Sequence, residues 1–273
     1  MLILKNNVHT VIFDWAGTAV DYGCFAPLEV FIKVFSKKGI QITIEEAREP
    51  MGLKKIDHIK ALTKMKRIDE LWKQKYGQRA DQTDIEEIYD DFEKSLLEIL
   101  DKYADPIPGI IETVAELREK GIKIGSTTGY TSEMMKIVSA ESAKKGYEPD
   151  SIVSSTDTAE GRPKPFMIYK NALNLAVYPM SRILKVGDTI SDIKEGLNAE
   201  VWTAAVVMGS SELGLTKKEA ADMDSKKLES MIYSVTKKFK DAGAHYVLED
   251  IKEVTAAVND INSRLKAGEL PNE

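Results

Sequence analysis

Short apolar runs alternate with longer helical patterns along most of the chain. Each run holds strand-forming residues and ends at a polar or glycine-containing turn; the runs occupy residues 9–13, 122–126, 151–155, 183–187, 202–207 and 245–248. Amphipathic patterns lie between them, such as residues 110–120, which follow Pro108 and end at Gly121. This alternation is typical of α/β proteins and predicts a Rossmann-like, doubly wound parallel sheet.

One long segment departs from the alternation, because residues 22–104 contain helical patterns and no apolar run of the strand type. Residues 105–109, "DPIPG", form the linker that returns to the core. We therefore predict an all-helical cap domain, residues 22–104, inserted into a core domain formed by residues 1–21 and 105–273. An insertion directly after the first strand would lie above the ligand-binding crevice as a lid.

The helices of the cap carry recognisable start and stop signals. Pro27 and Gly39 bound the first helical pattern, and the second covers residues 43–65. We predict two capping boxes, at Thr43 with Glu46 and at Thr83 with Glu86. In a capping box, the side chain at the helix start and an acid three residues later each accept a hydrogen bond from the other's backbone amide.

Composition narrows the function classes. The chain has 38 basic and 44 acidic residues, a formal charge of -6, and therefore no positive excess for holding a nucleic-acid backbone. A single cysteine, Cys24, excludes an internal disulfide and fits a reducing compartment, so the cytoplasm is expected. No apolar stretch approaches the roughly 18 residues that span a bilayer. The opening residues read as a lead-in to a strand rather than as a signal peptide.

Two further regions have simple interpretations. Residues 209–240 are polar and helical in pattern, so their charges are expected on a solvated face. Asp14, Thr128 and Asp188 each stand just beyond a predicted strand, where parallel sheets bind ligands. Each of the three residues, taken alone, is also an ordinary turn residue.

Four motifs of the chain match the loops of a known superfamily in order and spacing. The motifs "FDWAGT", "STTGY", "GRPKP" and "VGDTISDIKEG" resemble the four signature loops of the haloacid dehalogenase superfamily. More narrowly, "DWAGTAVDYGCFAP", "MGLKKIDH" and "GSTTGYT" resemble the phosphonoacetaldehyde hydrolase (phosphonatase) family, and the similarity covers nearly the whole chain. The resemblance implies a hydrolase acting on a small phosphonate and a homodimer with contacts through the cap.

The resemblance assigns roles in phosphoryl transfer. Asp14 is expected as the nucleophile that carries the phosphoryl group, and Mg²⁺ is expected on Asp14, Asp188 and the main-chain carbonyl of Ala16. Asp192 is expected to orient the metal site without being one of the first ligands of the cation. Alternatively, Asp192 is only an acid in the first turn of a helix, where a negative charge is favourable.

The phosphoryl oxygens need hydrogen-bond donors and a positive charge. Thr128 and the amides around Gly129 are the expected donors. Arg162 is the expected cation, because the basic residue of this superfamily directly precedes the first proline of its loop, whereas Lys164 follows it.

Ala16 stands where phosphatases of this superfamily keep a second aspartate, which protonates the departing alkoxide. A phosphonate that carries a neighbouring aldehyde can do without that acid. If a lysine condenses with the aldehyde, the protonated imine accepts electrons, and the carbon leaves phosphorus as a neutral enamine. The missing carboxylate therefore points to a lysine in the cap.

The segment "MGLKKIDHIKAL" offers that lysine. On a continuous helix Met51 and Lys55 share one stripe, whereas Lys54 faces away and can pair with Asp57. An apolar site would lower the pKa of Lys55 from its free value near 10.4, and Met51 is expected to supply an apolar wall or simply to fill the core.

The remaining site residues rest mainly on the resemblance. His58 is expected as a proton shuttle, with an inert helix-surface histidine as the alternative. The other substrate-binding residues expected are Gly52, Tyr130 and Cys24, and Cys24 could equally be a small buried hydrophobe.

The sequence therefore predicts Mg²⁺-dependent hydrolysis of the carbon–phosphorus bond of phosphonoacetaldehyde to acetaldehyde and phosphate, through a lysine Schiff base and an aspartyl phosphate. One alternative is a phosphatase or phosphomutase of the same superfamily acting on a small phosphate ester. A non-catalytic binding protein is the other, and it would be expected to lose Asp14 or Asp188. The group that activates water for hydrolysis of the aspartyl phosphate is not identified by the sequence.

Overall fold

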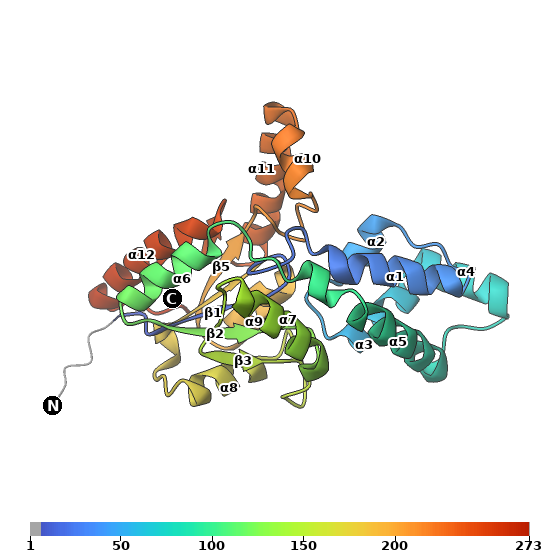
Figure 1. Ribbon diagram of the computed structural model, residues 1–273, viewed down its shortest axis with the longest axis horizontal. Helices are drawn as coiled ribbons and strands as arrows, with labels where there is room; N and C mark the ends of the chain where they lie inside the picture. The colour runs from blue at the N-terminus through green and yellow to red at the C-terminus, as the bar shows by residue number, and fades with distance from the viewer. Residues whose placement is uncertain (1–6, 273) are drawn as a thin grey trace.

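A parallel sheet of six strands forms the centre of the computed structural model, which describes residues 7–272 (Figure 1). The strand order is β3-β2-β1-β4-β5-β6, and every pairing is parallel. Their bounds are Thr10–Phe13 (β1), Lys123–Thr127 (β2), Ser151–Val153 (β3), Ile183–Gly187 (β4), Trp202–Val206 (β5) and Tyr246–Leu248 (β6). The predicted doubly wound sheet is confirmed, and the predicted lead-in before residue 7 lies outside the described residues.

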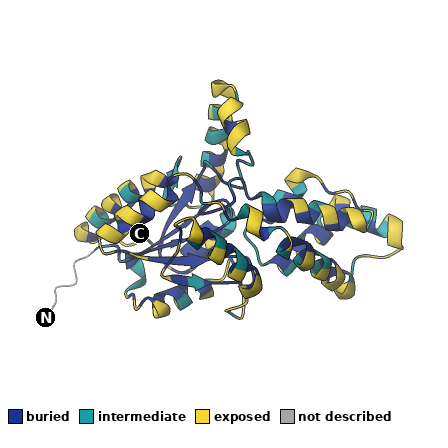
Figure 2. Cartoon of the chain, in the orientation of Figure 1, coloured by how far each residue is buried: buried dark blue, intermediate teal, exposed yellow. Residues whose placement is uncertain are grey.

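Helices cover both faces of the sheet, because alternate strand residues point to opposite sides and both sides are apolar. Val11 and Phe13 of β1 pack into one core with α6, α7 and α12, whereas Ile12 between them packs into a second core with α8. Ala205 of β5 joins α9 and α11 (Ser225–Asp241) in a third core. The bounds are Ile110–Glu119 (α6), Ser132–Lys144 (α7), Phe166–Asn174 (α8), Ile190–Asn198 (α9) and Val254–Ala267 (α12). Figure 2 shows the buried sheet between helices that are exposed on their outer sides.

Helices α1 to α5 form a group beside the carboxyl ends of the strands, which we call the helical unit (Figure 1). Their bounds are Phe25–Lys37 (α1), Ile44–Arg48 (α2), Lys55–Lys64 (α3), Lys66–Tyr76 (α4) and Gln82–Leu97 (α5). Phe31 of α1 stacks on Phe92 of α5 with ring centroids 4.2 Å apart. This apolar packing is continuous with the core of α6, α7 and α12. The division into cap and core domains stays a prediction.

Short 3-10 helices join some elements: η1 at Leu100–Tyr103, η2 at Met180–Arg182 and η3 at Ile251–Glu253. Gly121, just beyond α6, has a φ of 76°, in agreement with its predicted left-handed position.

The predicted continuous helix over residues 43–65 is wrong. The chain forms α2 and α3 with a turn between them, because Pro50 lacks the amide that a helix interior needs and Gly52 adopts a φ of 85°. Met51 therefore lies in the turn and not on a helical stripe. Lys54 is the N-cap residue of α3, and no ion pair joins it to Asp57 within residues 7–272.

One of the two predicted capping boxes is confirmed, at Thr43 and Glu46. The other is wrong, because α5 begins two residues earlier than the Thr83 and Glu86 signal indicated. Asp81 is its N-cap residue and forms the box with Asp84.

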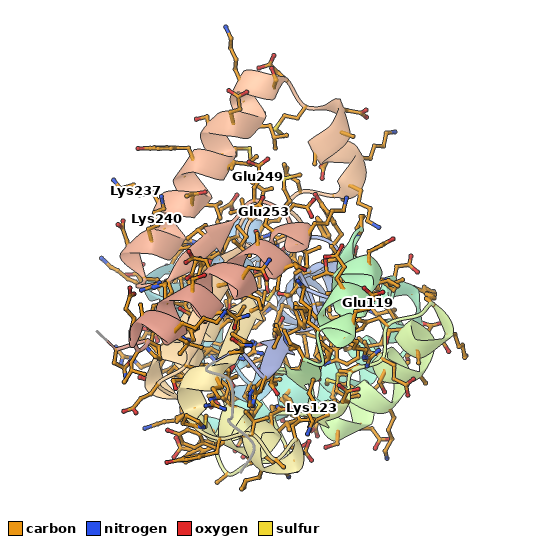
Figure 3. The ribbon with its side chains drawn as sticks, turned by 90° about the vertical axis from the view of Figure 1, so that its left-hand side faces the viewer. Glu119, Lys123, Lys237, Lys240, Glu249 and Glu253 are labelled. Carbon is orange, nitrogen blue, oxygen red and sulfur yellow. The ribbon has the colours of Figure 1, made fainter. Side chains whose placement is uncertain are left out.

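A helical hairpin projects from the core, formed by α10 (Lys217–Asp222) and α11 (Ser225–Asp241) (Figure 1). Only Val235 and Phe239 of α11 are buried, so most of its polar residues face solvent. Figure 3 shows Lys237 and Lys240 pointing outward from its lower part. Among the described residues, no helix is long and apolar enough to cross a membrane.

The corrected start of α5 can be tested by two substitutions. Asp81→Ala removes the acceptor for the Asp84 amide and is expected to lower the free energy of unfolding by about 1 kcal/mol. Thr83→Ala removes no capping contact and is expected to change that free energy by less than about 0.5 kcal/mol. Urea unfolding of the two variants measures both values; a larger loss for Thr83→Ala would restore the original assignment.

Candidate active site

The register of the sheet brings the carboxyl ends of three strands to one place. Phe13 of β1 lies opposite Ser126 of β2 and opposite Val186 of β4. The loops that follow carry Asp14, Thr128 and Asp188 into a single cavity, which the helical unit covers from the other side. The residues lining it are Asp14, Ala16, Cys24, Gly52, Lys55, Thr128, Gly129, Tyr130, Arg162, Asp188 and Thr189.

Arg162 binds three carboxylates inside this site and has a side chain that is 1% exposed. Its guanidinium donates to Asp14 Oδ1 at 2.6 Å and to Glu195 Oε2 at 2.9 Å, and it lies 3.0 Å from Asp192 Oδ1. It also donates to the carbonyl of Thr127 at 2.9 Å. Burial alone would lower the pKa of Arg162, but these carboxylates outweigh burial and raise it, so Arg162 is a permanent positive charge beside Asp14. Lys164, the alternative cation, is exposed.

A cluster of acids lies beside Arg162. One carboxylate oxygen from each of Asp14, Asp188 and Asp192 lies within 4.8 Å of the others. Burial raises the pKa of Asp188 well above its usual value, and the neighbouring Asp14 raises it further. Burial also raises the pKa of Asp14, although Arg162 opposes the shift. The positive groups nearby therefore do not fully compensate the burial of the Asp188 and Asp14 carboxylates.

Asp192 differs from the other two acids, because its oxygens are already bound. Lys185 donates to its Oδ1 at 2.7 Å and the Thr189 hydroxyl donates to its Oδ2 at 2.6 Å. Burial alone would raise its pKa, but Arg162 and Lys185 outweigh burial and lower it. This geometry agrees with a supporting role behind the other two acids.

The donor set suits a hard divalent cation. Four buried carboxylates, Asp14, Asp188, Asp192 and Glu195, face two buried cations, Arg162 and Lys185. Buried charges are stable only when they are compensated, and Mg²⁺ prefers carboxylate and carbonyl oxygens. Asp14, Asp188 and the carbonyl of Ala16, which borders the cavity, would hold such a cation.

Lys55 enters the cavity from the helical unit as the first residue of α3. It is 5% exposed, and its Nζ lies 5.1 Å from the ring centroid of Tyr130 and 5.9 Å from that of Phe31. Burial lowers its pKa below the ordinary value. The amine is thus held in the kind of apolar surroundings that favour its neutral, nucleophilic form.

The turn that precedes Lys55 sits tightly on the core. A Cβ on Gly52 would lie 2.4 Å from Thr189 Oγ1, and a Cβ on Gly129 would lie 2.6 Å from the carbonyl oxygen of Leu53. The Ser191 hydroxyl donates to the carbonyl of Met51 at 3.3 Å. Positions 52 and 129 therefore require glycine for this close approach, and the helical unit is closed over the strand ends.

Two predicted residues lie behind the cavity rather than on its wall. Met51 is buried, and only its carbonyl is bound to the core. His58 is fully buried, stacks on Phe31 at 3.8 Å, and binds the carbonyl of Ala47 through Nε2 at 3.0 Å. Burial, and then Lys55, lowers its pKa well below 6.5, so the ring is neutral. Its Nδ1 lacks a hydrogen-bond partner among the described residues.

Cys24 and Tyr130 both line the cavity, as expected for residues that contact a substrate. Burial raises the pKa of each well above the usual value, so both are protonated. Thr128 is 3% exposed, and its hydroxyl accepts a hydrogen bond from the amide of Tyr130 at 3.1 Å.

Sequence reasoning missed several side chains that hold the site together. Glu195 lies three residues after Asp192, on the same buried face of α9, and Lys185 is a charged residue inside an otherwise apolar strand. A lysine within a strand buried on both faces requires a buried acid, and this signal could have identified the pair with Asp192. Thr18, which donates to Asp188 Oδ1 at 3.2 Å, carried no comparable signal.

Comparison with known proteins places the chain among related enzymes. Residues 11–206 match the haloacid dehalogenase-like hydrolase family. A phosphonoacetaldehyde hydrolase from Bacillus cereus is 55% identical over 94% of this chain and 98% of its own length. A bifunctional phosphonoacetaldehyde hydrolase/aminoethylphosphonate transaminase from Clostridioides difficile is 52% identical over 98% of this chain, which covers 42% of that protein.

A solved structure agrees with these matches. The phosphonoacetaldehyde hydrolase-like protein from Oleispira antarctica superimposes with a TM-score of 0.95 at 37% identity, over 98% of this chain and 97% of that one. The similarity extends over nearly the whole chain, and the fold, the acid cluster and Lys55 agree with it. The chain belongs to the phosphonoacetaldehyde hydrolase family of the haloacid dehalogenase-like hydrolases.

Proposed function

We propose that the protein hydrolyses the carbon–phosphorus bond of phosphonoacetaldehyde to acetaldehyde and phosphate. The observation that carries this proposal is the presence of the Lys55 amine and the Asp14 carboxylate in one cavity, with Ala16 in place of a second acid. An amine activates an aldehyde, and a carboxylate attacks phosphorus. The relatives named phosphonoacetaldehyde hydrolase support the same substrate.

The reaction begins at Lys55. Its neutral amine adds to the aldehyde carbon, and uptake of one proton with loss of water forms a protonated imine. Asp14 then attacks phosphorus, and the electron pair of the carbon–phosphorus bond moves onto carbon to form a neutral enamine. Protonation of the enamine carbon and hydrolysis of the imine release acetaldehyde and regenerate Lys55. Water hydrolyses the aspartyl phosphate on Asp14 and releases phosphate.

Charge complementarity governs the transfer of the phosphoryl group, which is the second half of the proposed reaction. Arg162 neutralises Asp14 from one side, and Thr128 with the Gly129 amide would bind the phosphoryl oxygens. Mg²⁺ on Asp14, Asp188 and the Ala16 carbonyl would reduce the repulsion between the anionic nucleophile and the anionic substrate. Asp192, fixed by Lys185 and Thr189, would support that site from behind.

The remaining site residues are assigned by position. Tyr130 and Cys24 would bind the aldehyde end, and Gly52 permits the close approach of the cap turn. Met51 would close the apolar wall behind them. His58 would carry a proton through Nδ1, the ring atom that has no hydrogen-bond partner within residues 7–272.

The alternative function, a phosphatase or phosphomutase acting on a phosphate ester, needs an acid to protonate an alkoxide. Position 16 offers none, and the buried amine of Lys55 would have no task. We further propose that the helical unit acts as a cap that opens for each turnover. A homodimer formed through that cap and a cytoplasmic location complete the proposal.

Trapping tests the imine directly. Incubation with phosphonoacetaldehyde and borohydride is expected to place a reduced adduct on Lys55, located by peptide mass spectrometry, and none on the adjacent Lys54. Lys55→Arg is expected to lose at least about 10³-fold in kcat, because a guanidinium forms no imine. Acetaldehyde release without modification of Lys55 would exclude the imine mechanism, and absence of acetaldehyde in the presence of Mg²⁺ would exclude the function.

The pH dependence of trapping follows from the lowered pKa of Lys55. Only the neutral amine reacts, so adduct formation is expected to rise with pH and to level off above the pKa. Because burial lowers that pKa, the midpoint should fall below the ordinary 10.5. Quenched trapping at a series of pH values measures the midpoint, with reductive methylation of the exposed lysines as the reference. A midpoint equal to theirs contradicts an apolar site.

Removal of the cation should separate the two halves of the reaction. Chelation by EDTA is expected to reduce phosphate release by about 10³-fold, since the cation supplies several kcal/mol of charge stabilisation. The Lys55 adduct should still form, because imine chemistry does not use Asp188. Asp188→Asn should weaken Mg²⁺ binding in calorimetry; unchanged affinity would remove Asp188 from the metal site.

A further inference from the structure

Arg48 is the last residue of α2, and its side chain leaves the helical unit to reach two other segments. Its Nη1 donates to the carbonyl of Gly23 and to the carbonyl of Ser211, both at 2.8 Å. Its Nη2 donates to the carbonyl of Gly214 at 3.5 Å. The guanidinium carbon also lies 5.1 Å from the ring centroid of Phe25. One side chain of the helical unit therefore binds both the turn that leads into α1 and a loop of the core.

Within the described part of the chain, the hydrogen-bond partners of Arg48 are all backbone carbonyls. It is partly buried, burial lowers its pKa, and no carboxylate forms an ion pair with it within residues 7–272. A planar guanidinium can bind several carbonyls in fixed directions, whereas a lysine ammonium binds them as a point charge. The hydrogen bonds of Arg48 therefore use the shape of arginine. The charges of Asp188, Asp21 and Glu212 also favour its protonated form, although none of these acids forms an ion pair with it.

The loop that Arg48 holds, residues 209–214, leads to the acid cluster. The backbone amide of Ser211 donates to Asp188 Oδ2 at 2.8 Å. The amide of Gly23 donates to the carbonyl of Gly209 at 2.7 Å, so the turn that leads into α1 is bound to the same loop. A Cβ on Gly214 would lie 3.1 Å from Nε of Arg48, which shows how closely the guanidinium packs on the loop.

We propose that Arg48 is a positioning residue that couples the closed cap to the orientation of Asp188. Arg48 holds the carbonyl of Ser211, and the amide of the same residue holds Oδ2 of Asp188. When the cap closes, the guanidinium fixes this loop and with it the carboxylate. When the cap opens, Arg48 leaves, and the loop and Asp188 gain freedom. This inference rests on the proposed function in taking Asp188 as a Mg²⁺ ligand and the helical unit as a cap that opens and closes.

Two variants of Arg48 and one control test the coupling. Arg48→Met keeps the apolar stem and removes all three hydrogen bonds to the carbonyls. Arg48→Lys keeps the charge, but its ammonium can make only some of these hydrogen bonds. Arg67→Met is the matched control, because Arg67 is a cap arginine whose partners, Glu46 and the carbonyl of Gln41, lie within the helical unit.

The measurements are made first without substrate. Calorimetry gives the Mg²⁺ affinity, and hydrogen exchange with and without Mg²⁺ gives the protection of the Ser211 amide. For Arg48→Met we expect the Mg²⁺ affinity to weaken by about tenfold, which is at the lower end of the loss seen when a group that orients a metal ligand is removed. We also expect the backbone amide of Ser211 to exchange faster. Arg48→Lys should be intermediate, and Arg67→Met should match the parent protein. In turnover, kcat should fall by about tenfold in Arg48→Met and KM should change less.

The outcomes separate this inference from the proposed function. Parent-like Mg²⁺ affinity and parent-like protection of Ser211 in Arg48→Met overturn the coupling. If Arg48→Met does not fold, the same two measurements on Arg48→Lys decide, and parent-like values again overturn it. If the parent protein binds no Mg²⁺, the proposed metal site fails, and Ser211 exchange alone then decides whether Arg48 orders the loop.

Discussion

The buried charge network around Arg162 is the constraint on which the rest of the structure depends. One guanidinium binds Asp14, which follows β1, and also binds Asp192 and Glu195, which lie three residues apart on α9. Removing one partner from such a network leaves an uncompensated buried charge and typically costs 3–5 kcal/mol. The segments that follow β1, β3 and β4 can therefore take only the arrangement in which these groups meet, and that arrangement is the site.

The same network explains the division of labour among the acids. Asp192 and Glu195 are bound by Arg162 and Lys185, so they serve mainly to hold cations in place. Asp14, with Arg162 on one side, and Asp188, with no ion pair among the described residues, both have a pKa raised by burial, which makes them suited to a metal and to chemistry at phosphorus. The aromatic surroundings of Lys55 have the opposite character and disfavour a charged amine. The cavity thus joins an anionic half and an apolar half.

Much of this could be predicted from the sequence, and the failures have physical causes. The strands and the loops after them followed from period and turn chemistry, and Ala16 with a cap lysine indicated the reaction class. The stripe of Met51 and Lys55 assumed a continuous helix, although Pro50 and Gly52 interrupt it. The burial of His58 depends on packing between α1 and α3, which no local pattern encodes. The partners of Arg48 are backbone carbonyls, whose positions are invisible in a sequence.

The placement of Lys55 on the helical unit and of Asp14 on the sheet has a consequence for the fate of the substrate. Once the carbon–phosphorus bond has broken in the proposed reaction, the two-carbon fragment is attached to α3 and the phosphoryl group to the end of β1. Each fragment is covalently bound to a different part of the molecule. Movement of the helical unit away from the sheet would then pull the fragments apart, so that the motion which admits solvent also makes the cleavage irreversible.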